Sequence, residues 1–126
     1  MKSPERRARP RSSGLSKELT AGIAAALDKK ATDIVVLDLR KGSAFTDFFV
    51  ICTGANVRQV QAIAEAVQAA IGRAGGTPAL VEGLTRAEWV LIDYFDFIVH
   101  IFTPATREFY ALERLWGDAD RVEVSV

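Results

Sequence analysis

Apolar positions alternate with polar or bulky ones along two short stretches near the C-terminal end of the chain, residues 89–94 and 97–102. Both stretches are rich in β-branched and aromatic side chains, which strands favour, and only Phe95 and Asp96 separate them. This pattern predicts two adjacent strands joined as a short β-hairpin. The hairpin and the segment after it hold most of the aromatic side chains of the chain, so the other elements are expected to support them.

The predicted hairpin has two different faces, because successive side chains of a strand point to opposite sides of a sheet. One face is almost purely aliphatic and suits packing beneath helices: Val90, Ile92, Tyr94, Val99 and Ile101. The other mixes bulky apolar groups with one carboxylate and one imidazole: Trp89, Leu91, Asp93, Ile98, His100 and Phe102. If helices cover only the first face, the second is partly exposed and is a candidate binding surface. A sheet covered on both sides would explain the same residues, and the alternation leaves both interpretations open.

Helical spacing of apolar residues predicts three helices. The first covers residues 17–30 behind the N-cap Ser16. The second is long and opens with a capping box of Asn56 and Gln59; its apolar stripe is Val60, Ile63, Ala64, Val67 and Ile71. The third begins at the N-cap Thr103 and ends before Gly117, with Phe109, Leu112 and Trp116 on its packed face.

Three further runs are expected to be strands, at residues 33–39, 48–53 and 78–81. The last follows the long helix by a crossover and should run parallel to the strand before that helix. The expected order is helix, two strands, helix, three strands, helix. The predicted fold is therefore an α/β layer arrangement with a mixed sheet of about five strands.

The chain divides into one domain and two tails by composition. Residues 1–14 hold five basic residues and one acid and have too few apolar side chains to order themselves, so we expect a disordered basic tail. A transit peptide shares this composition, but Pro4 and Pro10 oppose the helix that it needs. Residues 15–117 form the expected domain, and residues 118–126 a weakly ordered tail. No apolar run is long enough to span a membrane, and a single cysteine suits a reducing compartment, so a cytoplasmic location is expected.

The titratable residues do not form a pattern typical of an enzyme. The chain has one His, one Cys and no metal-binding spacing, so no metal or cofactor is expected. Cys52 lies in an apolar run and is predicted to be a buried structural thiol, and Asp93 and Asp96 to make turn hydrogen bonds. Gly42-Ser43 and Asp47 are similar to the start of a nucleotidyltransferase motif, but Phe49 stands where its second acid would be.

Taken together, the motifs resemble those of the Iojap family, the ribosomal silencing factors, over residues 15–116. The residues that carry the resemblance are the strings 33–38, 46–47, 50–54, 82–83, 89–93, 96, 98–100 and 112–116, with Arg107 and Tyr110. The resemblance implies a core similar to a nucleotidyltransferase fold without its catalytic acids. The combined spacing is specific although no single motif is.

The resemblance also implies a function. Family members bind the large ribosomal subunit through a ribosomal protein at the subunit-joining face, hinder docking of the small subunit, and so lower translation when nutrients are scarce. The implied contact is the sheet surface around Trp89, and its expected residues are Trp89, Leu91, Asp93, His100, Phe102, Arg107 and Tyr110.

The charge of the chain bears on which partners it can bind. The body outside the basic tail holds eleven basic and fifteen acidic residues, which permits a basic ribosomal protein as partner and argues against broad nucleic-acid binding. The tail is expected to add at most weak contact with ribosomal RNA, and the sequence leaves open a homodimer of the free protein. The alternative function is a divergent nucleotide-binding or nucleotidyltransferase-like enzyme.

Overall fold

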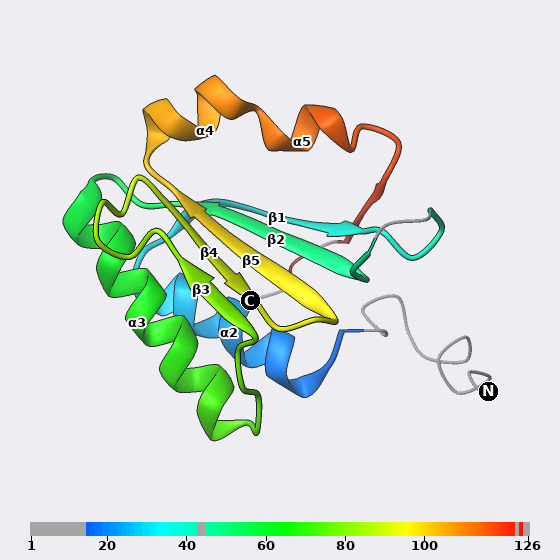
Figure 1. Cartoon of the computed structure of the whole chain (residues 1–126), viewed down its shortest axis with the longest axis horizontal. Coiled ribbons are helices and arrows are strands. Elements are labelled where there is room, and N and C mark those ends of the chain that lie inside the picture. The colour runs from blue at the N-terminus through cyan, green and yellow to red at the C-terminus, as the bar shows by residue number, and fades with distance from the viewer. Residues whose placement is uncertain (1–14, 43–44, 123, 125–126) are drawn as a thin grey trace.

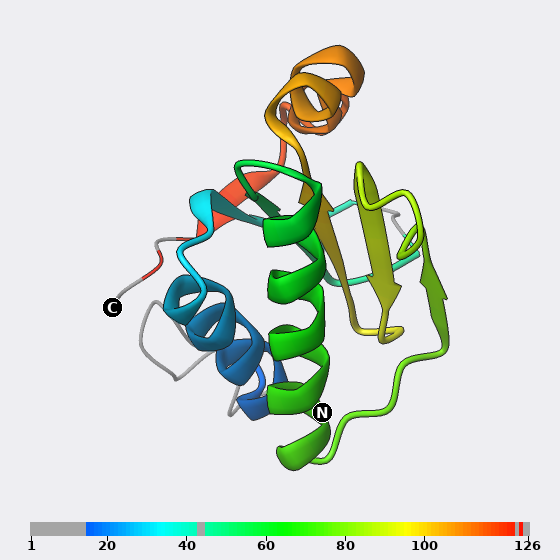
Figure 2. The same cartoon turned by 90° about the vertical axis from the view of Figure 1, so that its left-hand side faces the viewer.

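The fold is a mixed six-stranded sheet with helices on both of its faces (Figures 1 and 2). A computed structural model describes residues 15–42, 45–122 and 124 of the chain, so the predicted basic tail and Ser43 lie outside the described residues. The elements are α2 (Lys17–Asp28), β1 (Thr32–Asp38), β2 (Phe48–Thr53), α3 (Val57–Arg73), β3 (Leu80–Glu82), β4 (Trp89–Asp93), β5 (Phe97–Phe102), α4 (Pro104–Tyr110), α5 (Leu112–Leu115) and β6 (Asp120–Val122).

The strands lie in the order β3-β4-β5-β2-β1-β6. Neighbours are antiparallel except β2 and β5, which pair in parallel. The predicted hairpin is confirmed as β4 and β5. Strand β3 runs in the same direction as β2, as the crossover predicted, but β4 and β5 lie between them. The mixed α/β class is therefore confirmed, while the likeness to a nucleotidyltransferase fold stays a prediction.

Side-chain caps fix where the two long helices begin. Ser16 Oγ accepts from the backbone N–H of Leu19 at 3.1 Å, and Asn56 Oδ1 accepts from that of Gln59 at 2.9 Å. The Gln59 side chain reaches back to Ala55 N at 2.6 Å and also donates to the carbonyl of Lys29 at 3.0 Å. The start of α3 is thereby tied to the end of α2. The N-caps predicted at Ser16 and Asn56 are confirmed, whereas Thr103 precedes α4 without a side-chain cap bond.

The face of the sheet that α2 and α3 cover forms the larger hydrophobic core together with these helices. Val90, Ile92 and Ile101 have no exposed surface and pack there with the apolar stripe of α3, as the alternation predicted. Cys52 is buried in the same cluster, which confirms its structural role, and burial raises the pKa of its thiol to about 12. None of the described helices is both long and apolar enough to cross a bilayer.

The C-terminal part of the chain differs from the prediction in two ways. Residues 120–122 form the edge strand β6, which pairs with β1, where a weakly ordered tail was expected. The strand is held by backbone pairing with β1 and by Val122, which packs against the larger core. The sequence does alternate Val122 and Val124 with polar residues there, but the prediction did not use this short pattern. The expected last helix is broken at Ala111, whose φ of 46° is left-handed, and this break leaves Phe109 79% exposed instead of packed.

The tip of the hairpin holds a residue in an unfavourable conformation. Phe95 is 72% exposed and has a φ of 71°, in the left-handed region that side chains other than glycine rarely adopt. Asp93 Oδ1 accepts from the Phe95 N–H at 2.8 Å, and the Phe95 carbonyl accepts from Thr46 Oγ1 at 2.6 Å. These two bonds hold the strained residue in place and confirm the turn role predicted for Asp93.

We expect Phe95→Gly to stabilise the protein. Glycine removes the steric cost of the left-handed conformation, about 1–2 kcal/mol. Part of this gain in stability is lost, because glycine also increases the conformational entropy of the unfolded chain. The expected net effect is a rise of the thermal midpoint by about 3 °C, measured by circular dichroism. Gly83→Ala is the matched control: Gly83 has a φ of 87°, and an added Cβ would collide with the carbonyl oxygen of Trp89. That variant should lose stability, and a fall of the midpoint in Phe95→Gly would contradict the strain argument.

Candidate functional site

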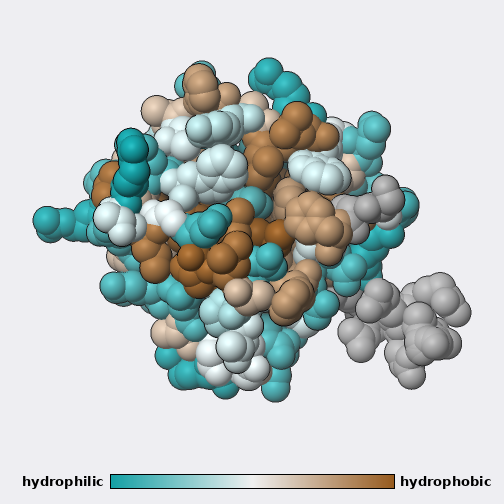
Figure 3. Space-filling model, viewed as in Figure 1, coloured by the Kyte–Doolittle hydropathy of each residue, from teal (hydrophilic) through white to brown (hydrophobic). Residues whose placement is uncertain are grey.

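The outer face of the sheet, opposite α2 and α3, carries the candidate surface. Its accessible part lies on β4, where Trp89, Leu91 and Asp93 are partly buried, and on α4, where Tyr110 is 50% exposed. Figure 3 shows apolar side chains gathered in a band across the middle of this face, beneath α4 and α5. Four of the predicted site residues therefore meet on one accessible surface.

The other half of the outer face is buried, which agrees with the second interpretation that the alternation left open, a sheet covered on both sides. His100 is 3% and Phe102 0% exposed, because α4 and α5 cross over β5 and Leu112 and Trp116 pack against the strand residues (Figure 1). Alternation correctly assigned both residues to this face. It could not predict the cover, because the break at Ala111 divides the expected helix into α4 and α5, and the sequence does not show how these two short helices lie against β5.

Trp89 is the centre of the accessible surface. Its indole contacts the rings of Phe102 and Tyr110, with centroids 5.0 and 4.8 Å away, and its Nε1–H donates to His100 Nδ1 at 3.1 Å. A shallow hollow of about 290 Å³ opens beside the indole, lined by Gly83, Leu84, Thr85, Arg86, Glu88, Trp89, Thr106 and Tyr110. An aromatic group held at the rim of a hollow suits contact with another macromolecule.

His100 is a buried, neutral imidazole. An indole N–H can only donate, so His100 Nδ1 must be the unprotonated acceptor and Nε2 carries the proton. Nε2 has no hydrogen-bond partner, and Phe49 stands edge to face with the imidazole at 4.7 Å. Burial in these surroundings lowers the pKa of His100 to about 4. The residue therefore cannot reach a partner through its own surface, as the predicted contact required.

Arg107 is an internal tether. Its side chain is only 13% exposed and donates to the carbonyl of Asp33 at 2.7 Å, to Thr53 Oγ1 at 2.8 Å and to Glu113 Oε2 at 2.7 Å. A bulge in β1 between Thr32 and Val35 contains Asp33, whose carbonyl Arg107 bonds. Burial alone would raise the pKa of Glu113, but its bonds to Arg107 hold it below the usual range. The tether fixes α4 and α5 over the sheet.

Several exposed apolar side chains on neighbouring elements were not among the predicted site residues. Leu84 lines the hollow, Leu80 lies on the edge strand β3, and Leu115 projects from α5 with 75% of its surface exposed. Leu115 could not be identified because the sequence predicted one continuous helix, in which its orientation would differ. The accessible surface is thus wider than the predicted set.

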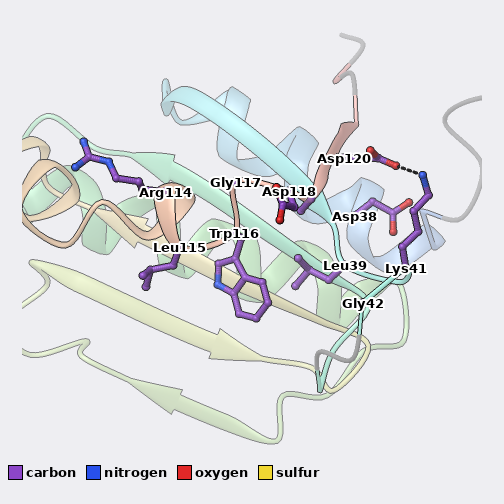
Figure 4. Close-up of a pocket in the computed structure, with 11 residues that line it drawn as sticks. Asp38, Leu39, Lys41, Gly42, Arg114, Leu115, Trp116, Gly117, Asp118 and Asp120 are labelled. Atoms are coloured by element: carbon purple, nitrogen blue, oxygen red, sulfur yellow. Dashed lines mark ion pairs between the residues drawn. The ribbon is translucent and has the colours of Figure 1, made fainter.

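A second hollow, of about 490 Å³, lies between α5 and the end of β1 (Figure 4). The Trp116 indole and Leu39 lie together beneath α5, and the ion pair of Lys41 and Asp120, at 2.8 Å, stands at the other end. Opposite charges line this hollow in similar number, so it favours no single class of ligand. Across the described residues, no group of three or more His, Cys, Asp or Glu side chains could hold a metal ion.

Comparison with known proteins connects this surface to one family. The family model described as "Ribosomal silencing factor during starvation" matches residues 13–126. A ribosomal silencing factor from Halalkalibacterium halodurans is 44% identical over 97 residues, which cover 77% of this chain and 83% of the relative. One from Bacillus subtilis is 43% identical over 101 residues, covering 80% and 86%. The chloroplastic protein Iojap of Zea mays is 37% identical over 100 residues, covering 79% of this chain and 43% of that protein.

Solved structures agree with these sequence matches. A crystal structure of a protein from Chromobacterium violaceum superimposes with a TM-score of 0.78 at 35% identity, covering 89% of this chain and 92% of that one. A crystal structure of a protein from Bacillus halodurans gives a TM-score of 0.74 at 41% identity, covering 83% and 95%. Two solved chains that are 35% and 41% identical to this one therefore share its fold.

Proposed function

The chain belongs to the family of ribosomal silencing factors, and on that premise we propose that it represses translation by binding the large ribosomal subunit at its joining face. The bound protein hinders association with the small subunit by occupying the space that the small subunit needs. The action is steric and makes or breaks no bond. A cytoplasmic location and repression under nutrient limitation belong to the same proposal.

The observation that supports this proposal most directly is the surface around Trp89. A stable contact of a small domain uses about 800 Å² on each partner and depends on one or two aromatic anchors. Trp89, Tyr110 and Leu91 supply such anchors on the outer face, and Leu84 lines the same hollow as Trp89 and Tyr110. We propose these residues as the contact and Asp93 as a polar group at its rim. His100, Phe102 and Arg107 support the surface from within.

The proposed partner is a basic ribosomal protein. The excess of acidic over basic residues in the body of the chain favours such a protein over bare RNA, because phosphate contact needs a basic surface. Weak contact of the basic tail with ribosomal RNA stays a secondary prediction, as does a homodimer of the free chain. Neither is needed for the steric mechanism.

No observation favours the nucleotidyltransferase alternative. Phe49, which stands in place of the second acid, is buried with its ring 5.5 Å from that of Trp116 and 4.7 Å from that of His100. The two bacterial relatives described above are named as ribosomal silencing factors. Calorimetry with ATP or CTP and magnesium tests the alternative, and heat of saturable binding would revive it.

Sedimentation with separated ribosomal subunits tests the proposal. The purified chain should travel with the large subunit and not with the small one, and preincubation with the large subunit should reduce the fraction of joined ribosomes. The order of addition is the control: added after joining, the chain should have less effect, because the joining face is already covered. Sedimentation with the small subunit alone, or no effect on joining, would contradict the proposal.

A further inference from the structure

We infer that His100 is a positioning residue, which holds the Trp89 indole in the one orientation that the binding surface needs, through the hydrogen bond from Trp89 Nε1 to His100 Nδ1. This inference rests on the proposed function. It gives a role to a polar side chain that is buried in an apolar cluster and does not itself reach the surface.

The register of the hairpin brings the two side chains together. Trp89 pairs with Phe102 and Leu91 pairs with His100, so Trp89 and His100 are diagonal neighbours on the same face of an antiparallel pair. The rings of Phe102 and Tyr110 both contact the indole, with centroids 5.0 and 4.8 Å away. Both rings are tilted against the indole, at 33° and 47°, and so meet neither of the preferred stacked and edge-to-face geometries; the second torsion angle of a tryptophan is also broad. The bond of 3.1 Å selects which edge of the indole faces inward and therefore which edge faces a partner.

The buried imidazole is poorly explained by packing alone. His100 Nε2 is a buried donor with no partner, and a buried polar group without a hydrogen bond destabilises a fold. A leucine of similar bulk would occupy the same space without this cost. What histidine adds at this position is an acceptor at Nδ1. The Trp89 Nε1–H makes no second hydrogen bond among the described residues, so this acceptor alone fixes it. Burial keeps the imidazole neutral, and therefore able to accept, at every pH well above 4.

The matched variants are His100→Asn and His100→Leu, in the full-length chain. Asparagine and leucine branch alike, but only asparagine offers an oxygen close to where Nδ1 lies. Leucine should give the more stable fold, because it leaves no buried polar atom unpaired. Asparagine should give the tighter binder, because it can still hold the indole. If the role of His100 were merely structural, affinity would follow stability, so the opposite order of the two variants is diagnostic.

Hydrogen exchange of the Trp89 indole and affinity for the large subunit are the two measurements. In ¹⁵N–¹H spectra, the indole N–H of Trp89 is assigned by its absence in Trp89→Phe; its proton should exchange slowly with solvent in the unmodified chain and in His100→Asn, and fast in His100→Leu. In sedimentation with large subunits, His100→Leu should bind about tenfold more weakly, and His100→Asn within about threefold of the unmodified chain. In the Trp89→Phe background, which has no indole N–H, His100→Leu should weaken binding no further.

Three outcomes would overturn the inference alone: fast exchange of the Trp89 indole proton in the unmodified chain, equal affinities of the two His100 variants, or a full additional loss from His100→Leu in the Trp89→Phe background. The first needs no variant, so it decides the matter even if a substitution prevents folding. Absence of large-subunit binding by the unmodified chain overturns the proposed function, and this inference with it.

Discussion

Lowering the pH from 6.5 to 4 is expected to destabilise the folded chain by about 3 kcal/mol through His100 alone. Burial holds the pKa of this imidazole at about 4 in the folded state, against 6.5 for an unperturbed histidine. Between these values the unfolded chain binds the proton and the folded chain does not. The contribution of the neutral imidazole is therefore complete above pH 6.5 and is lost progressively as the pH falls to 4.

Denaturant unfolding at a series of pH values measures this effect, and His100→Leu is its control. Carboxyl groups also titrate in this range, but they do so in both proteins. The free energy of unfolding of the unmodified chain should fall more steeply with decreasing pH, and the difference between the two curves isolates the imidazole. Parallel curves would show that His100 is protonated in the folded state or reaches solvent, which the tight aromatic surroundings oppose.

Local patterns of the sequence predicted the elements and the two faces of the hairpin because each depends on a short-range rule. Alternation requires only that a strand be extended, so it placed Val90 beneath the helices and Trp89 on the outer face. The caps at Ser16 and Asn56 depend on hydrogen bonds within three residues. Such short-range interactions form in nearly the same way whatever the rest of the fold is.

The remaining features depend on contacts between distant parts of the chain. Arg107 bonds the carbonyl of Asp33, which is 74 positions earlier and belongs to a bulge that the sequence does not reveal. The same tether holds the short helices that bury His100 and Phe102. An exposed arginine on a predicted helix and an arginine inside such a network look alike in sequence. Alternation could therefore identify a face but not the fraction of it that solvent reaches.

Trp89→Ala is expected to weaken binding to the large subunit by about 2 kcal/mol or more, roughly thirtyfold, because the partner loses the aromatic anchor that fills its apolar surface. The substitution should also affect folding stability, which the alternation did not suggest. The indole also contacts Phe102, Tyr110 and His100, so its removal costs some folding stability as well. Affinity must accordingly be measured well below the thermal midpoint of the variant.

Val90→Ala is the control, since Val90 is the next residue of β4 and is completely buried on the opposite face. This substitution leaves a cavity beneath α3 and should lower the free energy of unfolding by roughly 2 kcal/mol while leaving the affinity of the folded chain unchanged. Thermal unfolding and subunit sedimentation of both variants separate the two effects. The opposite result would be tight binding by Trp89→Ala and weak binding by a folded Val90→Ala. The contact would then lie on the face of the sheet that α2 and α3 cover, and the outer face would not be the binding surface.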